Sequence, residues 1–308
     1  MTRALVLGGG GPVGIAWETG LAVGLAEKGV RVATADRILG TSAGSAVGAA
    51  LAGGQDMAAL AERMYGVATA EAAAVAAAAP ADPLPATEPA AHGNDDVMQT
   101  LMALMADTGS DDRTPEETRA RLGEFALAQD TIPEDTFILF FTDLAAGDWP
   151  ASFACTAVHA GTGEFVVWEQ SHGVELQRAV ASSCSVPGIF PPITIGEGRY
   201  IDGGMRSALN ADQVVGADIA IVVSCMPLSI PGVDDPRLQR MEQAVRSELA
   251  VLTDSGAEVE LVVPSDAFLE ISGFGMFLMD GTRGAAAYQA GIDQGRDEAA
   301  RLGEIWNR

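Results

Sequence analysis

Two short apolar segments near the start of the chain each run through a turn of small residues into a helical pattern. Residues 4–8 lead through the glycine loop 9–14 into a helical pattern at 14–28, and residues 37–40 turn sharply into a second helix that ends near Leu51. A buried strand that passes directly into a helix is the repeating unit of a parallel sheet, because the crossover helix carries the chain back to the same end of the sheet. These segments restrict the chain to an α/β architecture.

The remainder of the chain continues this alternation. Residues 137–142 are rich in β-prone side chains, and 151–168 read as two strands around a turn at Gly161-Thr162-Gly163. Further short strands are expected at 198–201, 219–223 and 259–263, and helices near 174–182, 235–254 and 283–303. The pattern predicts a layered α/β fold with a largely parallel central sheet.

One region departs from the alternation. Residues 66–96 are rich in alanine and proline, which predicts a loop or linker, whereas 97–130 have helical apolar spacing. We interpret residues 55–133 as a helical insertion with this linker inside it, and residues 1–308 as one domain.

Charge and cysteine content exclude several classes of function. The formal net charge is −24, so nucleic acid is not an expected partner, and anionic membranes would repel the chain at long range. No apolar run is long enough for a transmembrane helix, and the apolar start is too short for a signal peptide. Cys155, Cys184 and Cys225 are widely spaced, which is typical of reduced thiols in a cytoplasmic protein rather than of a metal site.

Gly40-Thr41-Ser42-Ala43-Gly44 fits the G-x-S-x-G pattern of a nucleophile elbow. The pattern lies between an expected strand and an expected helix, where a sharp turn would expose the Ser42 hydroxyl. The positive end of the helix dipole would also favour negative charge there. A helix cap in a small-residue loop is the alternative interpretation.

The glycine loop has two possible uses. Consecutive N–H groups at Gly9, Gly10 and Gly11 could bind an oxyanion. With Gly14 the loop also fits the G-x-G-x-x-G fingerprint of dinucleotide binding. That fingerprint needs an acidic residue at the end of the second strand, whereas Asp36 precedes the strand here.

A third motif, Asp202-Gly203-Gly204, follows the expected strand at 198–201. Alone it would read as a turn. The three histidines are His92, His159 and His172, and none lies late enough in the chain for the histidine of an ordinary α/β-hydrolase.

Together these motifs resemble the patatin-like phospholipase family. The resemblance runs from the glycine loop and the Ser42 motif through residues 181–192, ASSCSVPGIFPP, to residues 200–204, YIDGG, and 216–219, GADI. It is weakest over 55–133. It implies a three-layer α/β/α fold and a serine acyl hydrolase that cleaves fatty-acyl esters of lipids.

The resemblance also assigns roles to residues. It implies that Ser42 is the nucleophile, that Asp202 is the only base, and that Gly9, Gly10 and Gly11 form the oxyanion hole; Gly14, Gly40, Gly44, Gly203 and Gly204 are the motif glycines. No metal or other cofactor is expected. Many relatives carry Arg or Lys where this chain has Val13, so the resemblance implies acyl hydrolysis more strongly than a preference for phospholipids.

The sequence leaves two other functions possible, and it leaves the location of one apolar segment undecided. A catalytically silent interaction protein could keep this fold, although the presence of both Ser42 and Asp202 argues against it, and a nucleotide-dependent oxidoreductase is a further alternative. The apolar segment 268–279 could line an acyl pocket, touch a lipid surface transiently, or be buried core. The oligomeric state is left open.

Overall fold

The computed structural model describes residues 1–66, 94–106, 113–229 and 236–308, which form an α/β fold around one sheet. Its strands lie in the order β5–β6–β3–β2–β1–β7–β8, with β4 also paired to β3. Strands β3, β2, β1, β7 and β8 run parallel, whereas β4, β5 and β6 add antiparallel pairs at one side. The strands are β1 (Arg3–Leu7), β2 (Arg37–Gly40), β3 (Phe153–His159), β4 (Phe165–Glu169), β5 (Ile193–Ile195), β6 (Gly198–Asp202), β7 (Ile219–Val223) and β8 (Glu258–Val262). The predicted, largely parallel sheet is confirmed.

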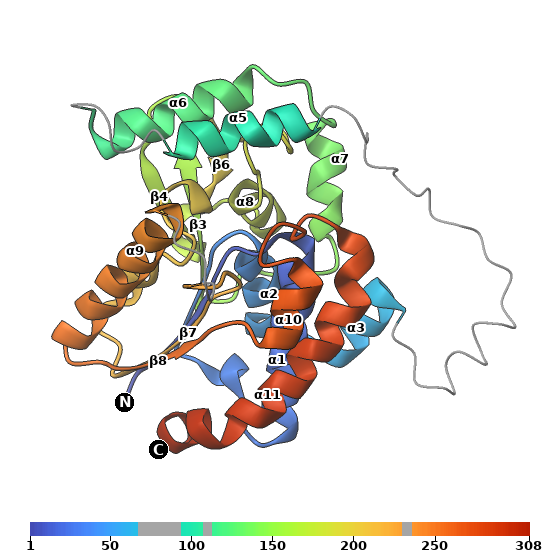
Figure 1. The fold of residues 1–308 in the computed structure, drawn as a ribbon, viewed down its shortest axis with the longest axis vertical. Helices are drawn as coiled ribbons and strands as arrows, with labels where there is room; N and C mark the ends of the chain where they lie inside the picture. The colour runs from blue at the N-terminus through green and yellow to red at the C-terminus, as the bar shows by residue number, and fades with distance from the viewer. Residues whose placement is uncertain (67–93, 107–112, 230–235) are drawn as a thin grey trace, which may run out of the picture.

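Alternating side chains of each strand enter two different cores, which makes the fold three-layered. Leu5 and Leu7 of β1 face one core, and Ala4 and Val6 face the other. The first core is covered by α1 (Gly11–Glu27), α2 (Ala43–Ala52), α3 (Met57–Tyr65), α8 (Leu176–Ser183), α10 (Asp266–Ser272) and α11 (Gly284–Trp306). The second core is covered by α9 (Pro236–Asp254), which lies on the opposite side of the sheet in Figure 1.

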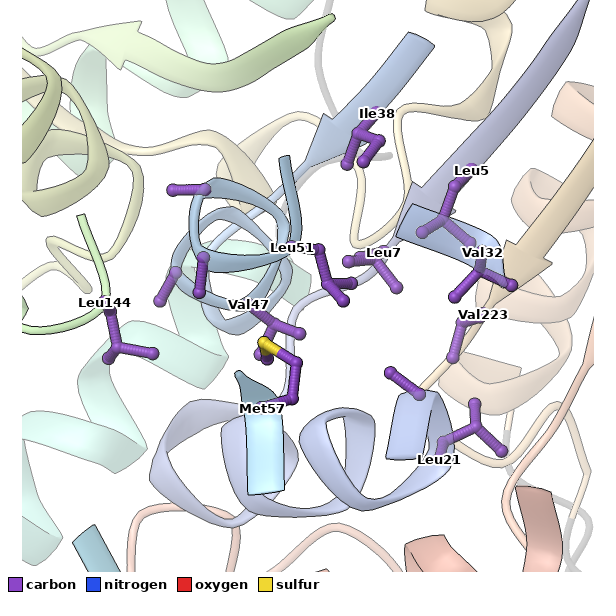
Figure 2. Close-up of a cluster of buried hydrophobic side chains, with 14 of the residues drawn as sticks. Leu5, Leu7, Leu21, Val32, Ile38, Val47, Leu51, Met57, Leu144 and Val223 are labelled. Carbon is purple, nitrogen blue, oxygen red and sulfur yellow. The ribbon is translucent and has the colours of Figure 1, made fainter. Parts of the chain in front are cut away.

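Figure 2 shows how the first core joins the sheet to the helices. Leu7 of β1 lies beside Leu51 of α2, Met57 of α3 lies beside Val47 of α2, and Val223 of β7 lies on the other side of Leu7. All five side chains are buried. Burial of apolar area at about 25 cal/mol per Å² stabilises this contact, and it holds α2 against the sheet.

Helices α1 and α11 approach each other closely because both carry glycines one turn apart. A Cβ atom added at Gly20 or Gly24 would overlap the backbone of α11, and one added at Gly291 or Gly295 would overlap the backbone of α1. The sequence pattern predicted both helices but did not predict this contact. The close packing of α11 fixes α1, and with it the glycine loop that precedes α1.

The β-prone run at 137–142 is not a strand, so this prediction was wrong. The chain forms α7 (Glu134–Ile138) and a 3-10 turn, η3 (Leu139–Phe141). Phe137, Phe141 and Leu144 are buried whereas Leu139 and Phe140 are exposed, which is a helical spacing. Pro133 at the N-cap and two acidic residues in the first turn favour the helix. A run of six residues is too short to distinguish the two-residue period of a strand from the 3.6-residue period of a helix.

The helices predicted over 97–130 are confirmed as α5 (Asn94–Ala106) and α6 (Pro115–Leu127). Leu101 and Leu122 from these helices pack against Val158 and Ile201 of the sheet. The Thr114–Glu117 capping box begins α6. The predicted linker falls mainly in 67–93, outside the described residues.

The remaining elements are short 3-10 turns. They are η1 (Val32–Thr34), η4 (Gln170–His172), η5 (Gly203–Met205), η6 (Ala211–Val214) and η7 (Gly281–Arg283). Among the helices described, none combines the length and hydropathy that crossing a bilayer requires.

Candidate active site

Ser42 stands at the turn between β2 and α2 in a backbone conformation that few side chains adopt. Its φ is 53° and its ψ is −120°. Such a conformation costs on the order of 1–3 kcal/mol and persists only where surrounding contacts hold it. The Ser42 N–H donates to Ser183 Oγ (3.1 Å), and the Ser42 carbonyl accepts from Ser45 Oγ (2.7 Å) and Cys184 Sγ (3.1 Å). The strand, sharp turn and helix have the geometry of a nucleophile elbow.

Strand β3 brings Asp202 to the same end of the sheet as Ser42. Gly40, two residues before Ser42, pairs with Cys155 of β3, and Asp202 pairs with Ala157 two residues further along β3. The Asp202 N–H donates to the carbonyl of Ser185 (2.9 Å), which fixes the end of β6. The two motifs are 160 positions apart in the sequence, and the sheet register places their polar side chains together.

The Asp202 carboxyl is buried, with 2% of the residue exposed. Burial raises its pKa to about 7 because the charged form loses its hydration. Hydrogen bonding from the Ser42 side chain and from the Gly204 N–H, which lies 2.7 Å from Oδ1, favours the ionised form and partly offsets burial. A carboxylate with this pKa next to a hydroxyl is able to accept a proton near neutral pH.

A buried polar network joins the two motifs beneath the site. Thr41 Oγ1 lies 2.9 Å from Thr156 Oγ1, and Asn210 Nδ2 donates to Thr41 Oγ1 (3.0 Å) and to the Gly203 carbonyl (3.3 Å). Asn210 itself has a left-handed backbone, with a φ of 54°. This network fixes the Ser42 turn relative to the Asp202 turn. The network could not be predicted from the sequence, because an isolated asparagine and two threonines form no recognisable pattern.

The glycine loop lies directly beside Ser42. A Cβ atom at Gly9 would be 3.5 Å from Ser42 Cβ. The Gly9 N–H donates to the Ala208 carbonyl (2.8 Å), so it is occupied within the protein. In the described part of the chain, the N–H groups of Gly10 and Gly11 have no hydrogen-bond acceptor. Gly11 also begins α1, whose dipole adds partial positive charge at this point.

The motif glycines are required by close contacts. Gly11 has a φ of 58°, and a Cβ there would lie 2.6 Å from the Leu278 carbonyl oxygen. A Cβ atom at any of the other motif glycines would also come too close to a neighbouring atom. Gly44 faces the Leu7 carbonyl, Gly40 the Ser45 backbone, Gly10 and Gly14 the Cys225 side chain, Gly203 Thr156, and Gly204 the Asp202 carboxylate.

An apolar cavity of about 180 Å³ opens at Ser42. No lining residue carries a charge. They come from the start of α1, the Ser42 turn, α3, the α7–η3 region and the segments after α8 and α10. The lining residues are Gly11, Pro12, Ile15, Ser42, Ala43, Met64, Phe137, Phe140, Phe141, Leu144, Cys184, Val186, Phe190 and Met279. Such a lining suits a hydrocarbon chain and disfavours a charged group.

The apolar segment 268–279 is partly core and partly cavity lining, and part of it is exposed. Phe268 is buried in the core, and Met279 lines the cavity. Phe274, Met276 and Phe277 are exposed. The Leu278 carbonyl accepts from the Val13 N–H (3.1 Å), which ties this segment to the helix that follows the glycine loop.

A second buried carboxyl, Glu18, lies below the glycine loop. The residue is 1% exposed, and neither carboxyl oxygen makes a hydrogen bond of normal geometry with the described residues. Burial raises its pKa well above the usual value, although the nearby Cys225 thiol and Gly8 backbone act in the other direction. Burial therefore favours the protonated form of Glu18. Its burial could not be predicted from the sequence, because a single glutamate in a helical pattern is usually exposed.

The two described histidines have structural partners. His159 Nδ1 accepts from the N–H groups of Gly161 and Thr162, both at 3.1 Å, and His172 packs edge-on against Trp168. Neither lines the cavity, and His92 lies outside the described residues. Within the described residues, no group of three His, Cys, Asp or Glu side chains could hold a metal ion.

The solved structures that match this chain include two of low sequence identity. VipD from Legionella pneumophila is 14% identical, with a TM-score of 0.45, and the match covers 97% of this chain and 67% of that one. The type III effector protein ExoU is 16% identical, with a TM-score of 0.35, and the match covers 96% of this chain and 53% of that one. The chain therefore spans about half the length of ExoU. Curated protein sequences give no match.

A sequence profile of one protein family matches residues 5–215, more than half of the chain. The matched range runs from β1 to just beyond η6, and it contains the glycine loop, Ser42, Asp202 and Asn210. The matched range thus covers Ser42, Asp202 and the glycine loop, whereas Met279 of the cavity lining lies outside it. This chain belongs to the patatin-like phospholipase family.

Proposed function

We propose that the protein is a serine acyl hydrolase that cleaves fatty-acyl esters, with Ser42 as nucleophile and Asp202 as base. The observation that carries the proposal is the strained Ser42 turn beside a buried carboxyl, at the opening of an uncharged cavity. Membership of a family of lipid hydrolases supports the same conclusion.

The first half-reaction forms an acyl-serine. Ser42 Oγ attacks the ester carbonyl carbon while its proton passes to the Asp202 carboxylate. The N–H groups of Gly10 and Gly11 bind the resulting oxyanion, and each well-placed donor contributes about 3–4 kcal/mol. The carbon–oxygen bond to the alcohol then breaks, and Asp202 returns its proton to the departing oxygen.

The second half-reaction releases the fatty acid. Water attacks the acyl carbonyl and transfers a proton to Asp202, the same N–H groups bind the second oxyanion, and the Ser42 oxygen leaves and regains the proton. The cycle returns each group to its starting state. It uses no metal, no cofactor and no histidine.

The cavity and the charge of the chain favour uncharged substrates. The cavity lining carries no charge, and the net charge of −24 repels anionic head groups at low salt. Val13, where many relatives carry a basic residue, is buried and supplies no cation. We expect p-nitrophenyl esters and neutral lipids to be cleaved faster than anionic phospholipids.

Covalent labelling tests the proposal. A fluorophosphonate probe should label one residue, and peptide mapping should identify it as Ser42. The Ser42→Ala variant should lose the label, whereas Ser182→Ala should keep it, because the buried Ser182 hydroxyl donates to the Ala179 carbonyl and not to the Ser42 turn. A folded wild-type protein that takes no label would instead support the alternative of a catalytically silent interaction protein.

A further inference from the structure

Exposed apolar side chains gather around the opening of the Ser42 cavity. We call Leu139, Phe140, Phe274, Met276 and Phe277 the mouth patch. Met276 is 82% exposed, Leu139 is 67% exposed and Phe140 is 50% exposed. Single exposed apolar residues are common on protein surfaces, but several around one opening mark a contact surface.

The two halves of the mouth patch flank the same cavity. Phe140, in one half, lines the cavity, and so does Met279, which follows the other half directly in the chain. In Figure 1 the end of α7 and the loop after α10 lie close together above α1 and α2. The Val13 N–H holds this loop through the Leu278 carbonyl, next to the groups that would bind the oxyanion. The patch therefore surrounds the point where a substrate enters.

Backbone geometry keeps the second half of the patch exposed. Phe274 has a φ of 55°, between two glycines that also have positive φ. The Phe277 N–H donates to the Ser272 carbonyl (2.8 Å), and the Arg283 guanidinium stacks on the Phe277 ring at 4.2 Å. These contacts hold the apolar side chains at the surface, although burial would be more favourable for each of them.

The charges next to the patch exclude an anionic partner. Acidic residues predominate in the adjoining sequence, at Glu134, Asp135, Asp143, Asp266, Glu270 and Asp280. Two arginines contact these acids, and each is paired: Arg283 with Asp280 (Nε to Oδ2, 2.9 Å) and Arg178 with Glu134 (Nη1 to Oε1, 2.6 Å). A surface of anionic lipid would be repelled, whereas a zwitterionic surface would accept apolar side chains without that cost.

We propose that the mouth patch docks the protein on a zwitterionic lipid bilayer, with the Ser42 cavity facing the lipid. The inference rests on the proposed function, since a lipid substrate must leave a bilayer to reach Ser42. Docking would exclude water from the opening and would let an acyl chain move from one apolar environment directly into another. A second copy of this chain is the competing occupant of the patch.

The test compares two double variants in the full chain. Leu139→Ser with Met276→Ser alters the two most exposed patch residues, neither of which lines the cavity. Val215→Ser with Val251→Ser is the matched control, because both valines are about half exposed and lie outside the patch, with Val251 on α9 across the sheet. Binding is measured by co-sedimentation with phosphatidylcholine vesicles, and turnover with a water-soluble p-nitrophenyl butanoate.

Wild type, the control and Ser42→Ala should bind the vesicles. The Leu139→Ser/Met276→Ser variant should bind at least about tenfold more weakly, because two large apolar side chains no longer enter the lipid. Its turnover of the soluble ester should stay within about twofold of wild type. Anionic lipid added to the vesicles should weaken wild-type binding at low salt, and added salt should reverse that effect.

Three results would overturn the docking proposal: absence of wild-type binding, equal binding by both double variants, or a wild-type dimer that the patch variant converts to a monomer. The last result would assign the patch to self-association. Failure of the proposed function would give a different result, namely vesicle binding without turnover of any ester by wild type.

Discussion

The floor and the walls of the candidate active site are built by different means. The floor consists of backbone held in tight turns at strand ends, with Ser42 at positive φ and glycines wherever a Cβ atom would collide. The walls consist of large apolar side chains from α7, η3 and the loop after α10, segments with no common motif. The floor therefore admits few substitutions, because each changes the backbone, whereas the walls can vary in size. We infer that the floor determines the chemistry and the walls determine which acyl chain is accepted.

The largest effect should come from the side chain that completes the floor. Asp202→Asn should lower kcat/KM on the order of 10³- to 10⁴-fold, because an amide cannot accept the Ser42 proton. The fold should be kept, because the amide replaces the carboxyl without a change in size and removes a buried acid. Steady-state kinetics with p-nitrophenyl butanoate and circular dichroism measure the two effects. A variant with more than a tenth of wild-type activity would exclude Asp202 as the base.

The pH dependence of the wild type should report the same carboxyl. Asp202 must be ionised to act as a base, and its pKa is about 7, so kcat/KM should rise with pH through a single ionisation near 7. A variant with His92, His159 and His172 all replaced by Gln should keep this rise. Its disappearance in the histidine-free variant would show that an imidazole is the base.

A smaller effect should follow from a distortion of the floor that leaves every catalytic side chain in place. Gly11→Ala adds a Cβ atom 2.6 Å from the Leu278 carbonyl at a φ of 58°, so the loop must move and displace its N–H groups. We expect kcat to fall on the order of 10²-fold, as for the loss of one oxyanion donor.

Gly29→Ala is the matched control for this distortion. Gly29 has a φ of 87°, but a Cβ there meets no atom within 4 Å, and it follows the far end of α1. The Gly29→Ala substitution should lower the free energy of unfolding by about 1 kcal/mol and leave kcat unchanged. Equal losses of kcat in both variants would mean that the effect comes from strain in general, and not from the position of the oxyanion loop.

The smallest effect should come from the walls. Phe140→Ala widens the cavity at its opening and should raise the ratio of kcat/KM for decanoyl over butanoyl esters by about three- to tenfold. The cost in stability should be small, because Phe140 is half exposed. Leu139→Ala, next to it but outside the lining, should leave the ratio unchanged. An unchanged ratio in Phe140→Ala would show that this wall does not select the acyl chain.

The difference between floor and walls also explains what the sequence could predict. Glycine and serine patterns at strand ends report backbone geometry that is local in the chain, so the Ser42 turn and the glycine loop could be predicted. The roles of Ser42, Asp202 and the glycines stay predictions until activity is measured. The fact that the Gly9 N–H is already bonded to the Ala208 carbonyl could not be predicted, since Ala208 lies 199 positions away.

Apart from the segment that ends at Met279, the walls could not be predicted, because they depend on contacts between distant segments. The run at 137–142 has both β-prone composition and helical burial, and only its packing decides between them. Asn210 and Glu18 are single polar residues whose surroundings are formed by distant parts of the sequence. The glycine spacing at Gly20–Gly24 and Gly291–Gly295 was a usable signal for the α1–α11 contact. The interpretation of residues 1–308 as one domain stays a prediction.

As the pH rises, ionisation of the buried carboxyls of Asp202 and Glu18 lowers the stability of the folded chain, whereas catalysis requires the ionised form of Asp202. An acid whose pKa is higher in the folded than in the unfolded chain holds a proton that the unfolded chain has already released, so stability falls as the pH rises. For Asp202 this decline begins near its ordinary pKa of 3.8 and continues to about 7, at about 1.4 kcal/mol for each unit of difference, and Glu18 adds a decline of the same sign. Asp202 therefore ionises, and becomes able to accept the Ser42 proton, only at a pH where its contribution to the stability of the native state has been lost. The contribution of these two carboxyls to stability is therefore greatest in mild acid, where a protonated Asp202 cannot act as a base.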